Sequence, residues 1–306
     1  MDFSAEVLTT LSAAPLLRLK KLEVEFKGTD AGGWSVPVLS STASAGPREL
    51  QLTNEYSRLE VFISFPEALL GLHNKLSIDA VEGFSQLRTL KIDTFTVTDL
   101  TPLAGCPQLR ELSIPRNGSL ASLALLGCCA QLEVLNVTKC HQLSSLEGLE
   151  ACSQLKRLDM YDCTALRTIA PLSACSQLKN LNIGQCELVS NLAPLSACVR
   201  LERLIMWGTS MSSLEPLSAC RLLKRLNIRW CAHVISLTPL AACGQLRAVY
   251  VEGCDELTSV EPLQACAQLE ELGSSRRGGV WVLSGVEALK AALPRLRTTC
   301  NGEPVM

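Results

Sequence analysis

The feature that most constrains this chain is a period of about 23 residues, marked by cysteine. One series recurs every 23 residues, with a single interval of 22: Cys106, Cys129, Cys152, Cys175, Cys198, Cys220, Cys243 and Cys266. A second series follows it by eleven residues: Cys140, Cys163, Cys186, Cys231 and Cys254. Together they hold 13 of the 15 cysteines. Such a period predicts a repeat architecture, in which each unit buries its apolar face only against its neighbours.

Each copy of the repeat begins with an apolar alternation, as in CSQLKRLDMYDCTALRTIAPLSA at 152–174. Alternating apolar residues predict a short strand with one buried face. A proline-leucine step follows in most copies, and proline suits the first turn of a helix. We therefore expect one short α- or 3₁₀-helical turn per repeat, capped in two copies by Thr101 and Thr238. The steps begin at Pro102, Pro171, Pro194, Pro216, Pro239 and Pro262.

The shared pattern L-x-x-L-x-L/I/M/V-x-x-C, followed by x-x-L-x-x-L-x-P-L-x-x-C, resembles the leucine-rich repeat family. In style the copies are most similar to the leucine-rich repeat proteins of protozoa such as trypanosomatids. The resemblance implies an α/β solenoid: an arc with a parallel sheet on its concave side and short helical or 3₁₀ turns on its convex side. The 56 leucines of the chain fit such a ladder.

The two ends of the chain depart from the period. We expect one continuous solenoid with an N-terminal cap of degenerate repeats at 1–83, regular repeats at 84–276 and a C-terminal cap at 277–306. Within the first cap, LRLKKLEVEF, ELQL, RLEVFISF and KLSI have the pattern of strands. Within the second, a helix is expected to start near Ser284 and, with Trp281, to seal the last repeat.

The cysteines have a structural and a metal-binding interpretation. Phe84 extends the first series one step back in place of cysteine, which indicates a position that closes the core. In two copies Asn117 and Thr209 take the place of the second cysteine. This favours a buried ladder of polar groups bonded to the backbone. Zinc ligands usually converge from short local spacings, whereas these thiols are spread along the chain. We expect structural cysteines, no metal site and no cofactor.

No sequence motif for catalysis is present. The chain lacks phosphate-binding glycine loops, a zinc-protease helix and a nucleophile elbow. Its three histidines are His73, His141 and His233; the last two follow a repeat cysteine closely and are expected in solvated turns. A catalytic site within residues 1–83 would have only one histidine, His73, as a general acid or base. We therefore expect a protein that is not an enzyme and has no small-molecule substrate.

Charge and thiol content bear on partners and compartment. With 28 basic and 30 acidic residues the net charge is -2, which gives no general attraction to nucleic acid or anionic lipid. No apolar stretch of about 18 residues predicts a membrane span. The N-terminal residues lack a secretory pattern, and so many thiols indicate a reducing compartment. The predicted location is the cytoplasm, with association with the cytoskeleton as an option.

The aromatic residues, only 4% of the chain, are concentrated where the repeat points side chains out of the concave sheet. Two of the four tryptophans and two of the three tyrosines fall there, among arginines. Tryptophan, tyrosine and arginine dominate the binding energy of protein interfaces. The predicted partner-binding residues are Arg157, Asp159, Tyr161, Arg203, Trp207, Arg225, Arg229, Trp230, Tyr250 and Glu252.

The sequence thus predicts a non-enzymatic scaffold or adaptor that binds a protein or peptide partner on its concave sheet. One alternative is a regulatory subunit of a protein phosphatase 1-like enzyme, since that family has a similar short repeat with a proline-leucine step, although this chain lacks its regular asparagine ladder. Another is a single-stranded nucleic-acid binder that uses the arginine and tryptophan side chains. Asp159, Asp162 and Glu252 on the same face count against nucleic acid.

Overall fold

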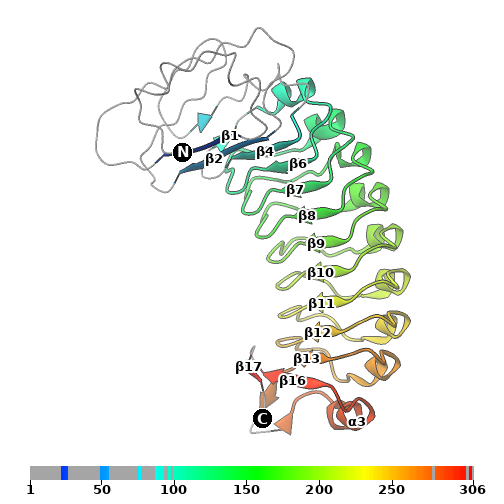
Figure 1. Cartoon of the computed structure of the whole chain (residues 1–306). Coiled ribbons are helices and arrows are strands. Elements are labelled where there is room, and N and C mark those ends of the chain that lie inside the picture. The colour runs from blue at the N-terminus through cyan, green and yellow to red at the C-terminus, as the bar shows by residue number, and fades with distance from the viewer. Residues whose placement is uncertain are drawn as a thin grey trace.

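The computed structural model describes residues 22–26, 49–54, 75–76, 87–92, 96–97, 99–277, 280–300 and 303–304. These residues form an elongated arc of stacked rungs, one rung per repeat (Figure 1). His73, Phe84 and the expected strand RLEVFISF lie outside the described residues. The proposed boundaries at residues 83 and 276 stay predictions.

One sheet runs through the arc and lines its inner side (Figure 1). The described residues give it 13 strands, and successive strands pair in parallel up to the last, which is antiparallel. Leu158, Leu181 and Leu204 lie side by side on neighbouring strands, so the repeat sets the register. This confirms the predicted parallel concave sheet. In order the strands are β1 (Leu22–Phe26), β2 (Glu49–Asn54), β4 (Thr89–Ile92), β6 (Glu111–Ser113), β7 (Val134–Asn136), β8 (Arg157–Asp159), β9 (Asn180–Asn182), β10 (Arg203–Ile205), β11 (Arg225–Asn227), β12 (Ala248–Tyr250), β13 (Glu271–Gly273), β16 (Arg297–Cys300) and β17 (Glu303–Pro304).

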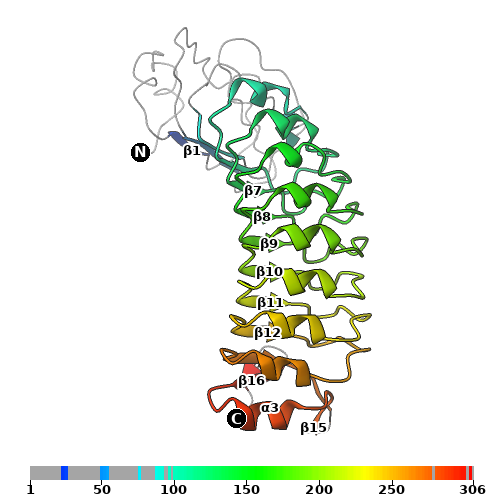
Figure 2. The ribbon, with the colours of Figure 1, turned by 90° about the vertical axis from the view of Figure 1, so that its right-hand side faces the viewer.

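A 3₁₀ turn returns the chain on the convex side of each regular repeat, and Figure 2 shows these turns stacked in a column. Prolines occupy the first or second position of most turns, as predicted. The turns are η2 (Thr101–Gly105), η3 (Ala124–Cys128), η4 (Leu149–Ala151), η5 (Ala170–Ala174), η6 (Ala193–Ala197), η7 (Glu215–Ala219), η8 (Thr238–Ala242) and η9 (Glu261–Ala265).

The prediction that Thr101 and Thr238 cap these turns is wrong. Both threonines are the first residue of the turn, so their own backbone N–H needs an acceptor. A polar side chain two residues earlier supplies it. The Thr101 N–H donates to Asp99 Oδ1 at 2.7 Å, and the Thr238 N–H donates to Ser236 Oγ at 3.1 Å.

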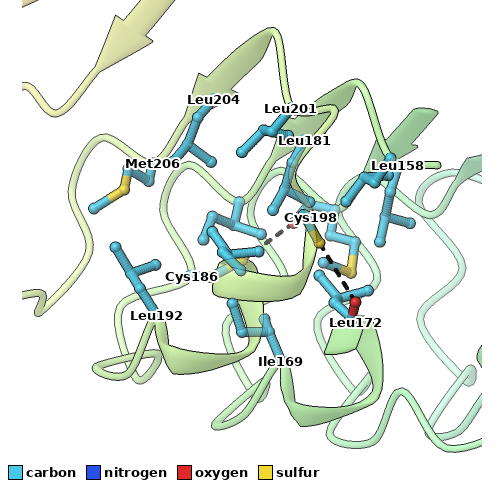
Figure 3. Close-up of a cluster of buried hydrophobic side chains, with 14 of the residues drawn as sticks. Leu158, Ile169, Leu172, Leu181, Cys186, Leu192, Cys198, Leu201, Leu204 and Met206 are labelled. Carbon is cyan, nitrogen blue, oxygen red and sulfur yellow. Dashed lines mark hydrogen bonds between the residues drawn. The ribbon is translucent and has the colours of Figure 1, made fainter. Parts of the chain in front are cut away.

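The interior is one continuous apolar cluster in which both cysteine series are buried (Figure 3). The thiols donate to backbone carbonyls of the preceding repeat: Cys198 Sγ lies 3.4 Å from Leu172 O, and Cys186 Sγ lies 3.1 Å from Met160 O. Asn117 takes the equivalent place in its own repeat and donates to Val97 O at 2.8 Å. The predicted polar ladder to the backbone is therefore confirmed.

Burial favours the protonated form of most ladder thiols; the pKa of Cys186 is instead lowered by its hydrogen bond with Cys163. All 15 cysteines are free, and those of the two series are buried. Burial raises the pKa of the Cys220 thiol from its ordinary value of 9.0 to about 11, and that of Cys243 to about 12. A thiol held in its neutral form keeps its hydrogen for the carbonyl and is a poor nucleophile.

Both ends extend the solenoid. Strands β1 and β2 confirm two of the strands expected in the first 83 residues, and β3 (Lys75–Leu76), which pairs with β5 (Thr96–Val97), confirms a third. Helix α3 (Val286–Ala292) begins two residues beyond the expected Ser284, after Gly285 in a left-handed conformation. A hairpin of β14 (Arg276–Arg277) and β15 (Val280–Trp281) precedes it. Among the described residues, no helix is long and apolar enough to span a membrane.

Candidate functional site

The concave face of β8 to β12 presents its side chains in four columns, because the strands are parallel and in register. The third and fourth columns continue past the strand ends, where backbone bonds such as Gln185 N to Trp207 O keep the rungs together. All ten predicted site residues fall in these columns. The first is Arg157, Asn180, Arg203, Arg225 and Ala248; the second Asp159, Asn182, Ile205, Asn227 and Tyr250; the third Tyr161, Gly184, Trp207, Arg229 and Glu252; the fourth Asp162, Gln185, Gly208, Trp230 and Gly253.

Three aromatic residues form a continuous row, which we call the aromatic row: Tyr161, Trp207 and Trp230. The ring centroids of Tyr161 and Trp207 lie 5.7 Å apart, and those of Trp207 and Trp230 lie 5.6 Å apart at an angle of 66°. Each such pair stabilises by about 0.5–1.5 kcal/mol beyond area burial. Trp230 is 60% exposed, whereas the other two are half-buried. The row is ordered by its own contacts and open to solvent at one end.

Glycines make room for both tryptophans. Gly184 lies in the column position between Tyr161 and Trp207, and a methyl group there would sit 2.8 Å from Trp207 Nε1. Gly253 is likewise close under the Trp230 ring. Sequence reasoning placed both glycines on the outward face but missed this role. The signal that could have found them is a glycine one repeat away from each tryptophan.

The backbone of Trp230 is unusual. Its φ is 54°, in the left-handed region that a bulky residue rarely adopts. The repeat imposes this conformation: Asp162 and Gln185 have φ of 60° at the same position, and Gly208 and Gly253 have 68° and 73°. The exposed indole is therefore held at a position that suits glycine better.

Arg229, Glu252 and Tyr250 form an internal cluster beside the aromatic row. The Arg229 guanidinium donates to both Glu252 oxygens, Nε to Oε2 at 2.7 Å and Nη2 to Oε1 at 2.8 Å. It also stacks on the Tyr250 ring, 4.6 Å from the centroid. The hydrogen bond to Glu252 raises the pKa of Arg229 further above its ordinary value. Glu252 is only 3% exposed, and its negative charge is compensated by Arg229 of the same chain.

Arg157, Arg203 and Arg225, which we call the arginine column, are different. All three are exposed, and within the part of the chain that the structure describes none forms an ion pair or a side-chain hydrogen bond. The nearby carboxylate of Glu202 is bound by Lys224 at 2.5 Å and approached by Lys179 at 4.0 Å. The hydrogen bond from Lys224 lowers the pKa of Glu202. The arginine column is therefore left with uncompensated positive charge.

Asp159 organises the end of its strand. Its Oδ1 accepts from Thr138 Oγ1 at 3.0 Å, from Asn182 Nδ2 at 3.1 Å and from the Tyr161 N–H at 3.2 Å. The last of these bonds recurs along the sheet. An Asn or Asp side chain accepts from the N–H two residues later in four repeats, a regularity that sequence reasoning also missed: Asn136, Asp159, Asn182 and Asn227.

The described residues give no arrangement for nucleophilic or metal chemistry. His141 Nδ1 faces Asp162 Oδ1 at 3.8 Å, and His233 Nδ1 contacts Glu256 Oε1 at 2.9 Å, both at the surface. The neighbouring Cys140 thiol donates instead to a buried carbonyl at 3.5 Å, and burial raises its pKa to about 11. Within the described ranges, no group of three or more His, Cys, Asp or Glu residues is placed to hold a metal ion.

Comparisons with known proteins identify the fold. No protein-family model matches the sequence, and no curated protein sequence matches it. Among solved structures, the internalin InlF of Listeria monocytogenes matches with a TM-score of 0.63 and 17% identity, over 94% of this chain and 82% of that one. The functional domain of InlJ from the same species, which includes a cysteine ladder, matches with a TM-score of 0.52 and 16% identity, over 94% of this chain and 63% of that one. Internalins are leucine-rich repeat proteins, so the chain has the leucine-rich repeat fold.

Proposed function

We propose that this protein is a non-enzymatic interaction scaffold that binds a protein or peptide on the concave face of β8 to β12. The observation that carries the proposal is the aromatic row. Single exposed aromatic residues are common on protein surfaces. Three that form a row, with Trp207 in contact with both Tyr161 and Trp230 and with Trp230 60% exposed in a left-handed conformation, are not explained by packing of the core. Such clusters of tryptophan, tyrosine and arginine supply most of the binding energy of interfaces.

The alternatives use the same surface. A phosphatase regulatory role differs only in the identity of the partner. A nucleic-acid role differs in its physics, since binding would weaken steeply with salt. Neither is favoured by a particular contact, and the net charge of -2 supports a polypeptide partner. We also propose a cytoplasmic location, for which the support is the set of buried, free thiols.

The proposal is tested by replacing Trp230 with glycine. Gly208 and Gly253 occupy the same position in other repeats with positive φ, so glycine suits the backbone there and Trp230→Gly removes only the indole. Loss of a hot-spot side chain costs about 2 kcal/mol, which is roughly a 30-fold loss of affinity. We expect capture of partners from native lysate, quantified against wild type, to fall by that order. The thermal midpoint should change little, because glycine relieves the left-handed strain while the ring contact with Trp207 is lost.

Ile235→Ala is the matched control. Ile235 is 63% exposed, between Cys231 and η8, away from the four columns. This variant should capture partners as wild type does. Unchanged capture by both Trp230→Gly and Trp207→Ala, with the fold intact, would sink the proposal. A salt-sensitive association with many nucleic-acid sequences would replace it with the alternative.

A further inference from the structure

We infer that the concave face recognises a carboxylate: the bound segment is a polypeptide with an Asp or Glu side chain beside an apolar side chain, and Arg203 and Arg225 hold that carboxylate. The inference rests on the proposed function and adds the chemical class of the partner. It is argued from the register of β10 and β11, from the pairing of every nearby acid and from the order of side chains along β10.

Arg203 and Arg225 are partners in register on adjacent parallel strands. Neighbouring strands lie about 4.8 Å apart, so the two arginine side chains leave the sheet from Cα atoms at about that separation. Like charges side by side on a sheet are unfavourable. An anion placed between them removes the repulsion, and the guanidinium fork matches a carboxylate in a bidentate geometry.

No acid of the described surface neutralises this pair. Glu202, the residue before Arg203, is bound by Lys224 at 2.5 Å. Glu252 is engaged by Arg229, and Asp159 by Thr138 and Asn182. Glu271, two rungs along the first column from Arg225, is hydrogen-bonded to Tyr250. The carboxylates of the face are thus satisfied internally while these two arginines are exposed and unpaired. The charge that completes the pair has to come from a partner.

The strand β10 and its exit also indicate what lies next to the carboxylate. Alternate residues of a strand share one face, so Arg203, Ile205 and Trp207 follow one another on the concave side. Ile205 and Trp207 are half-buried, and Trp207 continues into the aromatic row. A charged position followed directly by apolar ones fits an acidic side chain next to an aliphatic or aromatic one. Bases of a single-stranded nucleic acid also stack on such rings; what favours a polypeptide is the presence of Asp159 and Glu252 on the same face and the net charge of -2.

The experiment is a selection of peptides from a random phage-displayed library on the immobilised full chain. Enriched peptides are synthesised, and their affinities are measured by fluorescence anisotropy for wild type and for Arg203→Glu/Arg225→Glu. The matched control is Arg167→Glu/Arg221→Glu, which makes the same charge change at exposed residues outside the four columns. Circular dichroism and the thermal midpoint establish that each variant is folded.

We expect enriched peptides to pair Asp or Glu with Ile, Leu, Phe or Trp. Reversing the arginine pair should weaken them by about 30-fold or more, as loss of a hot spot does, and the control by less than about twofold. Replacing the peptide acid by its amide should weaken wild-type binding to a similar extent and should matter little for the reversed pair.

Neutral or basic enriched sequences, no enrichment at all, or an affinity indifferent to the arginine pair would each overturn the inference. If affinity does not depend on the arginine pair but binding is lost in Trp230→Gly, the proposed function stands and only the inference of carboxylate recognition fails. Indifference to Trp230→Gly as well means that both fail. A single-stranded oligonucleotide that displaces the peptides and binds more tightly would overturn the inference in favour of a nucleic-acid partner.

Discussion

The interior and the concave face of the same repeats differ in how regular they are. Inside, rung after rung repeats one chemistry, with Leu158, Leu181 and Leu204 in register and thiols bonded to the preceding carbonyls. Outside, the third column changes from an aromatic to a glycine, an aromatic, a cation and an acid within five rungs. Each interior residue meets a copy of its own surroundings, so the period constrains it. The outward residues meet solvent and are free to encode a specific contact.

Cysteine is well suited to the regular part. Its thiol is small enough to close a tightly stacked rung and still donates a weak hydrogen bond. The two series place that donor against a carbonyl of the preceding repeat, as a second bond to an oxygen that already accepts from a backbone N–H or, at Met206, from Thr209. The chemistry of the interior therefore depends on thiols that remain protonated.

The largest predicted effect follows from that dependence, and it concerns pH. Burial raises the pKa of Cys220 from 9.0 to about 11, and that of Cys198 to about 12. Between these values the unfolded chain releases protons that the folded chain keeps, so the free energy of unfolding falls as pH rises. Each such thiol contributes a slope of about 1.4 kcal/mol per pH unit. With many thiols acting together, we expect cooperative unfolding between pH 9 and 11, measured by urea titration at successive pH values.

The single variant Cys220→Ala sharpens this prediction. It should lower stability near pH 7 by about 1 kcal/mol through the lost hydrogen bond. It should also make the alkaline slope shallower by about 1.4 kcal/mol per pH unit, the contribution of one thiol. Cys300→Ala, at a half-buried cysteine outside both series, is the control. An identical slope in Cys220→Ala and wild type would contradict the view that the ladder thiols cause the alkaline transition.

The second prediction separates two kinds of arginine on the concave face. Arg229→Ala leaves the carboxylate of Glu252, 3% exposed, without its cation. Breaking a buried ion pair costs about 3–5 kcal/mol. Arg203→Ala removes an exposed side chain without a partner, and such changes stay within about 0.5 kcal/mol. Chemical denaturation of the two variants measures the difference. Equal costs would mean that the division of the face into structural and free arginines is wrong.

Much of the fold could be predicted from the sequence, because the period fixes phase. The strands, the convex turns and the buried cysteines follow from which positions are apolar in every copy. The caps of the turns could not be placed, because Thr101 and Thr238 gave no sign of whether they precede or begin the turn.

The concave site could be predicted only as a set of outward positions. That Arg229 is engaged by Glu252 depends on neighbours from two rungs and on Gly273, where a methyl group would lie 2.6 Å from Glu252 Oε1. These are contacts between copies, and a pattern within one copy does not contain them. The same holds for the glycine that seats Trp207.

The smallest predicted effect tests the contact between Gly184 and the Trp207 ring. Gly184→Ala adds a methyl group 2.8 Å from Trp207 Nε1, so the indole has to move away from Tyr161. The cost in stability should stay near 1 kcal/mol, the value of one aromatic contact. Tryptophan fluorescence should shift, and binding of any concave-face ligand should weaken severalfold. Gly244→Ala is the control, since nothing lies within 4 Å of a methyl group there. If both variants kept the wild-type spectrum and affinity, Gly184 would not be needed to position Trp207. The residues beyond the strand ends would then not be individually shaped for a contact, unlike those on the strands.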